Sequence, residues 1–202
     1  MKKLSLRGLY LMLLAFVLPM VANADNVAKI GSTEYETLAA AVSAAQAGET
    51  VEITVAGTYT VPNISTNITI QGDVDGVVFN CVGAERTSIA SIPNGATFKN
   101  VTLNMGNVNY HGFQHAGTIN MEGCTLNGKF FSYADMNFTN CQFVQDNSDY
   151  HMWVYGKGTV TYTDCTFTNN VIGKFLHLYS ESSENVGNVV VKNCKFINNG
   201  TE

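Results

Sequence analysis

The stretch TYTDCTFTNN, residues 161–170, returns in altered form along the second half of the chain. INMEGCTLNGKF (119–130), MNFTNCQFVQDN (136–147) and VVVKNCKFINN (189–199) place a cysteine at the same point of the pattern, and an earlier row has Val101 there. Apolar residues occupy the positions five before, three before and two after this point, with polar residues between them. This alternation predicts strands with one buried face.

The alternation breaks at the residue that precedes the cysteine position. The rows carry only Asn, Asp or Gly there: Asn100, Gly123, Asn140, Asp164 and Asn193. These residue types tolerate the left-handed backbone region, so each row is predicted to be a strand, a one-residue corner and a second strand. A cornered unit that recurs at positions 101, 124, 141, 165 and 194 predicts an all-β solenoid, whose stacked rows bury the face that one row cannot. We count about six such coils.

A short amphipathic helix is predicted before the coils. Thr33 and Glu36 have the spacing of a capping box, and Gly48 is placed to end the helix. Its apolar face would consist of Tyr35, Leu38, Val42 and Ala45. At this position the helix would cap the open edge of the first coil.

Two parts of the sequence carry a family resemblance. The segment TEYETLAAAVSAAQAGETVEITVAGTYT (33–60) and the NCxFxxN rows resemble right-handed parallel β-helix proteins of the pectate-lyase-like superfamily, where a Leu- and Ala-rich helix leads into AG(D/E)T, a strand and a GTY turn. The resemblance covers nearly all of the chain after residue 24 and implies a right-handed parallel β-helix. The superfamily includes polysaccharide lyases, polygalacturonases, esterases, phage tailspikes, adhesins and repeats with no known activity, so the fold implies no single function.

Residues 1–24 are predicted to be a secretory signal. Lys2, Lys3 and Arg7 precede an apolar run, and ANA at 22–24 is a small-residue cleavage site. The mature chain would form one β-helix domain over 25–202, with the cap helix and first strand in 25–56 and the coils in 57–202. We expect a bacterial protein that is secreted, periplasmic or on the cell surface, with no transmembrane segment after cleavage.

The charge of the mature chain argues against nucleic acid and anionic membranes as partners. The signal holds three of the 11 basic residues and none of the 16 acidic ones, so eight basic residues remain. Arg86 is then the only arginine. Nucleic acids and anionic membranes are bound by clusters of Lys and Arg. Because the mature chain has few basic residues and a net negative charge, we do not expect it to bind either.

The cysteines leave three interpretations open. In stacked coils Cys124, Cys141, Cys165 and Cys194 would form an internal column that continues from Val101, which favours a buried slot for a small apolar residue. Stacked neighbours lie about 4.8 Å apart, whereas a disulfide needs Cβ atoms about 3.8 Å apart, and five cysteines leave one unpaired. One or two disulfides, or a metal or catalytic role, are the alternatives; the inward positions lack the histidines that zinc favours. We expect no metal and no cofactor.

The strand before each cornered unit carries the candidate binding residues. KFFSY (129–133), HMWVY (151–155) and FLHLY (175–179) have one apolar, inward phase and one aromatic phase. The aromatic phase is predicted to point outward and to bind a ligand through Phe131, Tyr133, His151, Trp153, Tyr155, Phe175, His177 and Tyr179. HGFQH (111–115) would extend this face if Gln114 pointed inward, so that all four histidines lie on one face.

We predict a non-catalytic module that binds a polysaccharide or other glycan through this face, and assign no catalytic residue. A covering loop or a protein contact would also explain the exposed rings. One alternative is a fragment or divergent member of a polysaccharide lyase or glycoside hydrolase, with Asp135 and Glu181 as a carboxylate pair. The other is a structural or adhesin-like segment. Because the repeat still runs at Phe196, we expect either a C-terminal truncation or self-association through the last coil.

Overall fold

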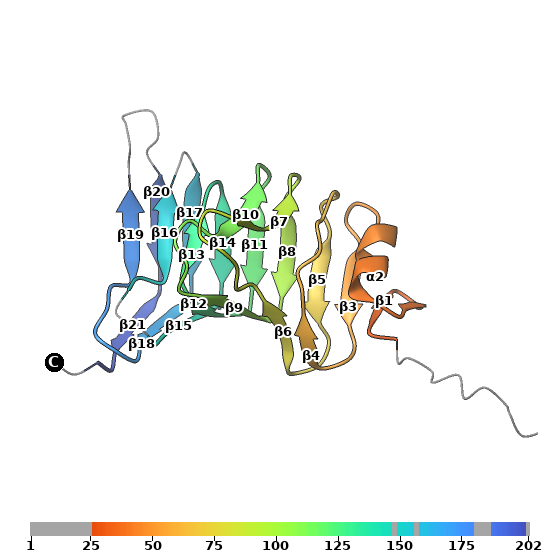
Figure 1. The fold of residues 1–202 in the computed structure, drawn as a ribbon, viewed down its shortest axis with the longest axis horizontal. Coiled ribbons are helices and arrows are strands. Elements are labelled where there is room, and N and C mark those ends of the chain that lie inside the picture. Colours follow the sequence, from red (N-terminus) through yellow and green to blue (C-terminus); the bar gives the residue numbers. More distant parts are fainter. Residues whose placement is uncertain (1–25, 147–148, 156–157, 180–186, 201–202) are drawn as a thin grey trace, which may run out of the picture.

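A computed structural model describes residues 26–146, 149–155, 158–179 and 187–200. The strands stack mainly in parallel and form an all-β solenoid of the β-helix type, whose layers run the length of the molecule (Figure 1). In the coils, strands pair in parallel with the equivalent strands of the neighbouring coils. The solenoid expected from the alternating rows is therefore present.

Two long sheets form two sides of the stack. The first sheet has the order β2 (Thr33–Tyr35), β1 (Ala28–Ile30), β3 (Thr50–Ile53), β5 (Thr69–Gly72), β8 (Ala96–Lys99), β11 (Ile119–Glu122), β14 (Met136–Thr139), β17 (Thr159–Thr163) and β20 (Asn188–Lys192). The second has the order β21 (Lys195–Asn198), β18 (Thr166–Asn169), β15 (Gln142–Gln145), β12 (Thr125–Gly128), β9 (Thr102–Gly106), β6 (Val77–Asn80) and β4 (Gly57–Tyr59).

Sheets with fewer strands form the remaining side. A third sheet contains β13 (Phe130–Ser132), β16 (Met152–Tyr155) and β19 (Leu176–Tyr179), and a separate pair contains β7 (Ser88–Ile92) and β10 (Gly112–His115). The third sheet is parallel and in register, with Phe131 beside Trp153 and Trp153 beside His177. Equivalent side chains of successive coils therefore lie next to each other on this side too.

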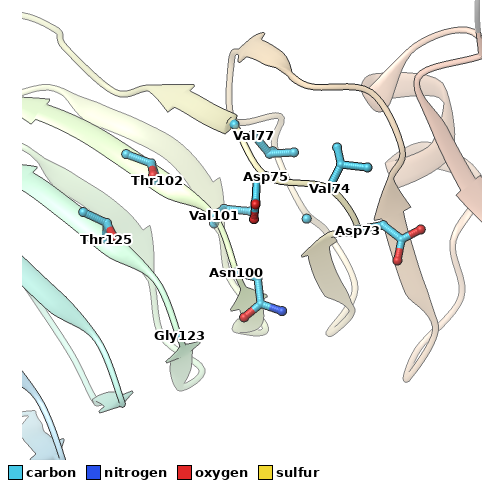
Figure 2. A pocket seen from close by; sticks show the side chains of 11 residues that line it. Asp73, Val74, Asp75, Val77, Asn100, Val101, Thr102, Gly123 and Thr125 are labelled. Carbon is cyan, nitrogen blue, oxygen red and sulfur yellow. The ribbon is translucent and has the colours of Figure 1, made fainter.

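The corner between the first two sheets is a single residue in the rows predicted to have one. Asn100, Asn140, Asp164 and Asn193 have φ of 53°, 52°, 55° and 51°, and Gly123 has φ of 62°. This confirms that the residue before the cysteine position adopts the left-handed conformation. Between β5 and β6 the corner is instead a loop, 73–76, that bulges outward beside the next coil (Figure 2).

The core is a set of stacked rows inside the coils. Phe138 lies over Tyr162 with ring centroids 5.2 Å apart, and Phe143 lies over Phe167 with centroids 4.4 Å apart. These rings are fully buried, as the inward phase of the rows predicts. Burial of a large apolar side chain stabilises the fold by about 1.5–3 kcal/mol, so each coil contributes through its neighbours.

A short helix, α2 (Leu38–Ala44), lies beside β1 and β3 at one end of the stack (Figure 1). Thr37 is its N-cap, and the Thr37 side chain accepts a hydrogen bond from the Ala40 N–H at 3.1 Å. The capping box predicted at Thr33 and Glu36 is wrong because Thr33 pairs with Ile30 in a β1–β2 hairpin. Leu38 and Val42 of the predicted apolar face are buried.

The predicted signal, residues 1–24, lies outside the described residues. Within the described part of the chain, no helix has the length and apolar character that a membrane crossing requires.

Candidate functional site

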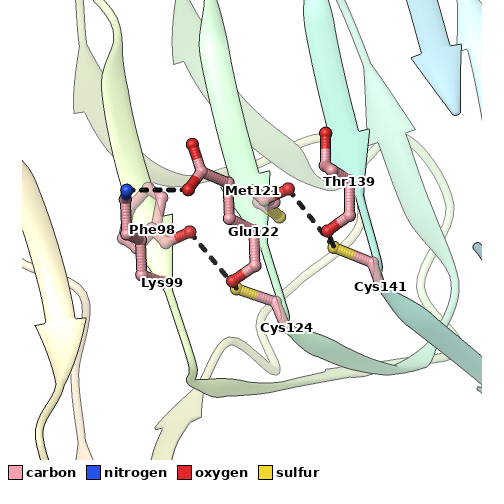
Figure 3. Close-up of polar contacts among 7 residues, drawn as sticks. All are labelled: Phe98, Lys99, Met121, Glu122, Cys124, Thr139 and Cys141. Atoms are coloured by element: carbon pink, nitrogen blue, oxygen red, sulfur yellow. Dashed lines mark hydrogen bonds and ion pairs between the residues drawn. The ribbon is translucent and has the colours of Figure 1, made fainter. Parts of the chain in front are cut away.

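The cysteine column lies inside the corner between the first two sheets. All five cysteines of the chain are free thiols, and Cys124, Cys141 and Cys165 are buried. The Cys124 thiol donates to the Phe98 carbonyl at 3.4 Å and the Cys141 thiol to the Met121 carbonyl at 3.3 Å, so each thiol bonds to the preceding coil (Figure 3). Of the three interpretations of the cysteines, the buried thiol column agrees with this geometry.

The thiols of Cys141 and Cys81 are poorly suited to nucleophilic chemistry. The hydrogen bond with the Cys124 thiol, followed by burial, raises the pKa of Cys141 to about 12, and burial raises the pKa of Cys81 to about 12. Because the thiolate is the nucleophile and the metal ligand, neither group reacts readily at neutral pH. No group of three or more His, Cys, Asp or Glu side chains in the described residues is arranged to hold a metal ion.

The outward face of the third sheet carries a group of rings that we call the aromatic cluster: Tyr110, Phe131, Tyr133, Tyr150, Trp153, Tyr155 and His177. Phe131 lies at its centre, with ring centroids 4.7 Å from Tyr133, 5.1 Å from Trp153 and 5.3 Å from Tyr155. Trp153 in turn lies 4.8 Å from His177. The rings are tilted against each other at 37–61° in these four contacts, so the surface shows edges as well as faces.

Several predicted binding residues lie in this cluster as expected. Trp153, Tyr155 and His177 are partly exposed, and Tyr133 is exposed at 38%. Phe131 belongs to the outward phase but is only 2% exposed, because the surrounding rings cover it. A ligand would therefore contact the rim of the cluster and not its central ring.

Two predicted binding residues point the other way. His151 was predicted to point outward, but it is fully buried in the core, where its ring stacks on Phe175 with centroids 5.9 Å apart. Phe175, also predicted outward, packs against the core. Both residues precede the strands that begin at Met152 and Leu176, and the chain turns there, so the alternation does not extend to them. The side chain of Tyr179 lies outside the described residues.

His151 is an apolar-core histidine with one polar contact. Its Nε2–H donates to the Asn169 Oδ1 at 2.6 Å, while its Nδ1 has no hydrogen-bond partner among the described residues. Burial lowers the pKa of His151 to about 4. The ring is therefore neutral near pH 7 and serves packing.

The segment 111–115 also has the opposite phase to the one required for the extended face. Phe113 is fully buried and Gln114 is exposed, so the prediction that all four histidines share one face is wrong. The pairing of β10 with β7 also has a register shift between Gly112 and Gln114. His111 is buried: its Nε2 lies 2.7 Å from the Cys81 carbonyl oxygen and its Nδ1 lies 2.7 Å from the Thr87 carbonyl oxygen.

Sequence reasoning missed the loop residues of the cluster. The Arg86 guanidinium lies 4.2 Å above the Tyr110 ring, although Arg86 is distant from the aromatic rows in sequence. Both residues adopt left-handed backbone conformations, with φ of 59° and 53°. Strained conformations of non-glycine residues often occur at binding or catalytic sites. No periodic signal marks them, because they lie in loops outside the strands.

Of the carboxylate pair proposed for a hydrolase, the structure describes only Asp135. The Asp135 carboxylate accepts a hydrogen bond from the Thr159 N–H at 2.7 Å and so joins two coils. Glu181, its proposed partner, lies outside the described residues. Asp149 forms an ion pair with Lys129, and Glu122 forms one with Lys99 at 2.7 Å (Figure 3).

A hollow of about 410 Å³ lies beside the bulged corner loop, away from the aromatic cluster. Asp73, Asp75, Asn100 and Thr102 are among its lining residues (Figure 2). Asp73 is partly neutralised by Lys29, whose Nζ lies 3.4 Å away. The aromatic cluster remains the better candidate for ligand contact because it offers exposed ring surface. Comparison of the chain with models of protein families, with curated proteins and with solved structures finds no match.

Proposed function

We propose that this chain is an exported, non-catalytic module that binds carbohydrate through the rim of the aromatic cluster. The single observation that carries the proposal is the contiguous set of partly exposed rings, Tyr133, Trp153, Tyr155 and His177, on one strand-built face. Aromatic rings offer apolar faces of the size of a sugar ring, and phenol and indole groups add hydrogen bonds at their edges. Contiguous exposed apolar surface commonly marks an interaction site.

The proposal includes a finer description of the fold. The stacked parallel strands support a right-handed parallel β-helix of the pectate-lyase-like superfamily, since parallel crossover connections are right-handed in nearly all proteins. The leader-like residues 1–24 support export to the periplasm, the cell surface or the medium. Neither feature specifies the sugar.

The structure offers little support for the lyase or hydrolase alternative. Lys129 and Asp149 neutralise each other, and the Asp135 carboxylate is used in the backbone contact between coils. A catalytic acid or base must be within hydrogen-bond reach of the reacting group. Release of unsaturated or reducing ends from a polysaccharide by the purified protein would contradict the non-catalytic proposal.

The experiment that tests the proposal measures binding to an array of neutral and acidic polysaccharides. We expect Trp153→Ala and Tyr155→Ala each to weaken binding about two- to tenfold, since a ring contact contributes about 0.5–1.5 kcal/mol. Phe196→Ala is the control, because Phe196 is an exposed aromatic residue on β21, outside the cluster. Binding that is unchanged in the two cluster variants, or an absence of binding to every polysaccharide, would contradict the proposal.

A further inference from the structure

Lys129 is a buried cation held between two side chains from neighbouring coils. Its Nζ donates to the Asn109 Oδ1 at 2.7 Å and forms an ion pair with Asp149. The Lys129 side chain is only 4% exposed, whereas the ion-paired Lys29 and Lys99 are 32% and 35% exposed. Lys129 therefore differs from the lysines that form ion pairs at the protein surface.

The three groups come from three successive coils and are held there by backbone contacts. Asn109 lies in the loop after β9, Lys129 lies between β12 and β13, and Asp149 lies between β15 and β16. The Lys129 N–H donates to the Gly106 carbonyl at 2.7 Å, and the Asn109 carbonyl accepts from the Arg86 N–H at 3.2 Å. The backbone thus brings an amine, a carboxamide and a carboxylate together before any reaction.

We propose that Lys129 and Asn109 react to form an isopeptide bond, with Asp149 as the proton acceptor. Asp149 takes a proton from the Lys129 ammonium, and the resulting neutral Nζ attacks the Cγ of Asn109, forming a C–N bond. Asp149 then delivers that proton to the departing Nδ2, the C–Nδ2 bond breaks, and ammonia leaves. The Asp149 carboxylate takes up the surplus proton of the new amide nitrogen. Nothing is oxidised or reduced, and the product lacks one ammonia, about 17 Da.

The surroundings of Lys129 favour this reaction over a simple ion pair. The Nζ lies 5.0 Å from the centre of the Tyr150 ring, so part of its environment is apolar. Reactants held in contact can have effective molarities on the order of 10⁵ M or more, which offsets the low reactivity of a carboxamide.

The bond would tie adjacent coils covalently in a chain whose cysteines are all free thiols. Asn109 and Lys129 are 20 residues apart in sequence, so the link would close a loop of that length. Closing a loop reduces the conformational freedom of the unfolded chain, as a disulfide does.

The test is peptide mapping of the purified wild-type chain by mass spectrometry. A glutamyl endopeptidase cleaves after Glu122, between Asn109 and Lys129. We expect the two resulting peptides to remain joined, with a mass about 17 Da below their sum. Two separate peptides of unmodified mass would overturn the proposal. So would a loss of about 18 Da within the peptide that contains both Lys129 and Asp149, since loss of water would join these two residues instead.

Variants identify the atoms involved. Lys129→Arg keeps the positive charge but cannot form the amide, and Asp149→Asn removes the proton acceptor; we expect both chains to give separate peptides. Lys99→Arg is the matched control, because Lys99 forms an exposed ion pair with Glu122, and it should leave the link intact. A persistent link in Lys129→Arg would overturn the assignment. If either variant fails to fold, the wild-type map still decides the question.

Discussion

The two ends of strands β9, β12, β15 and β18 of the second sheet are built in different ways. At the corner with the first sheet, the chain turns on one left-handed residue at Asn100, Gly123, Asn140, Asp164 and Asn193. Toward the third sheet, the chain takes a short step from Gly128 to Phe130 but a longer one from Gln145 to Met152 and from Asn169 to Leu176. The corner has the same backbone geometry in each of these coils, whereas the loops that lead to the third sheet differ in length from coil to coil.

The corner side of the coils contributes mainly to core packing, whereas the loop side carries the candidate binding residues. The corner side contains the thiol column, in which Cys124, Cys141 and Cys165 hydrogen-bond to carbonyls of the preceding coil. The loop side contains the aromatic cluster, the Arg86–Tyr110 contact and the buried Lys129. Loops on a rigid scaffold are where binding residues commonly gather, and here the scaffold and the loops belong to the same coil.

The largest expected effect comes from the core ring between the two regions. Phe143 stacks on Phe167 and also contacts His151, so Phe143→Ala should destabilise the fold by about 3–5 kcal/mol. Tyr133→Ala, at the exposed rim, should cost only about 0.5–1.5 kcal/mol. Urea unfolding of both variants measures the difference. Equal losses would show that the cluster is as much a part of the core as Phe143.

A second prediction concerns acid stability. Because burial lowers the pKa of His151 from an ordinary value of 6.5 to about 4, protonation favours the unfolded chain. The stabilisation is present above pH 6.5 and is lost as the pH falls toward 4, by on the order of 3 kcal/mol at about 1.4 kcal/mol per pKa unit. His151→Phe should flatten this part of the stability profile measured by urea unfolding.

His177→Phe is the control for that measurement, since His177 lies in the partly exposed cluster and not in the core. It should retain the wild-type loss of stability between pH 6.5 and 4. If His151→Phe kept the same slope as His177→Phe, another group would have to account for the acid sensitivity.

The smallest expected effect is at the corner. Asn140 has φ of 52°, so Asn140→Val should cost about 1–2 kcal/mol, because a β-branched residue is strained in the left-handed region. Asn140→Gly should change stability by less than about 0.5 kcal/mol. Thermal unfolding of the two variants measures this, and a tolerated valine would show that the corner residue is not what sets the turn.

The corner side could be predicted from sequence because its determinants are local. Period-two alternation identifies the inward rows, and Asn, Asp or Gly identifies the corner residue, so Phe138, Phe143 and Cys141 were placed correctly. The outward positions of Trp153 and Tyr155 follow from the same alternation within β16. No long-range information is needed for any of these.

The loop side could not be predicted in the same way. Alternation ends with the strand, so it gave the wrong direction for His151, one residue before β16. It also says nothing about Arg86 and Tyr110, whose contact depends on two loops from different coils. Burial of Lys129 depends on Asn109 and Asp149, each 20 residues away in sequence.

The single-residue corner has a consequence for how such a chain can change in length. A coil that begins and ends at this corner can be duplicated or deleted as a unit, because its neighbours present the same left-handed turn and the same small slot on either side. The buried position that follows the corner residue is occupied by Val101 in one coil and by Cys124 in the next. Duplicated coils would therefore fit the stack on the corner side without further substitutions. Their later sequence divergence would be concentrated in the loops that carry the aromatic cluster.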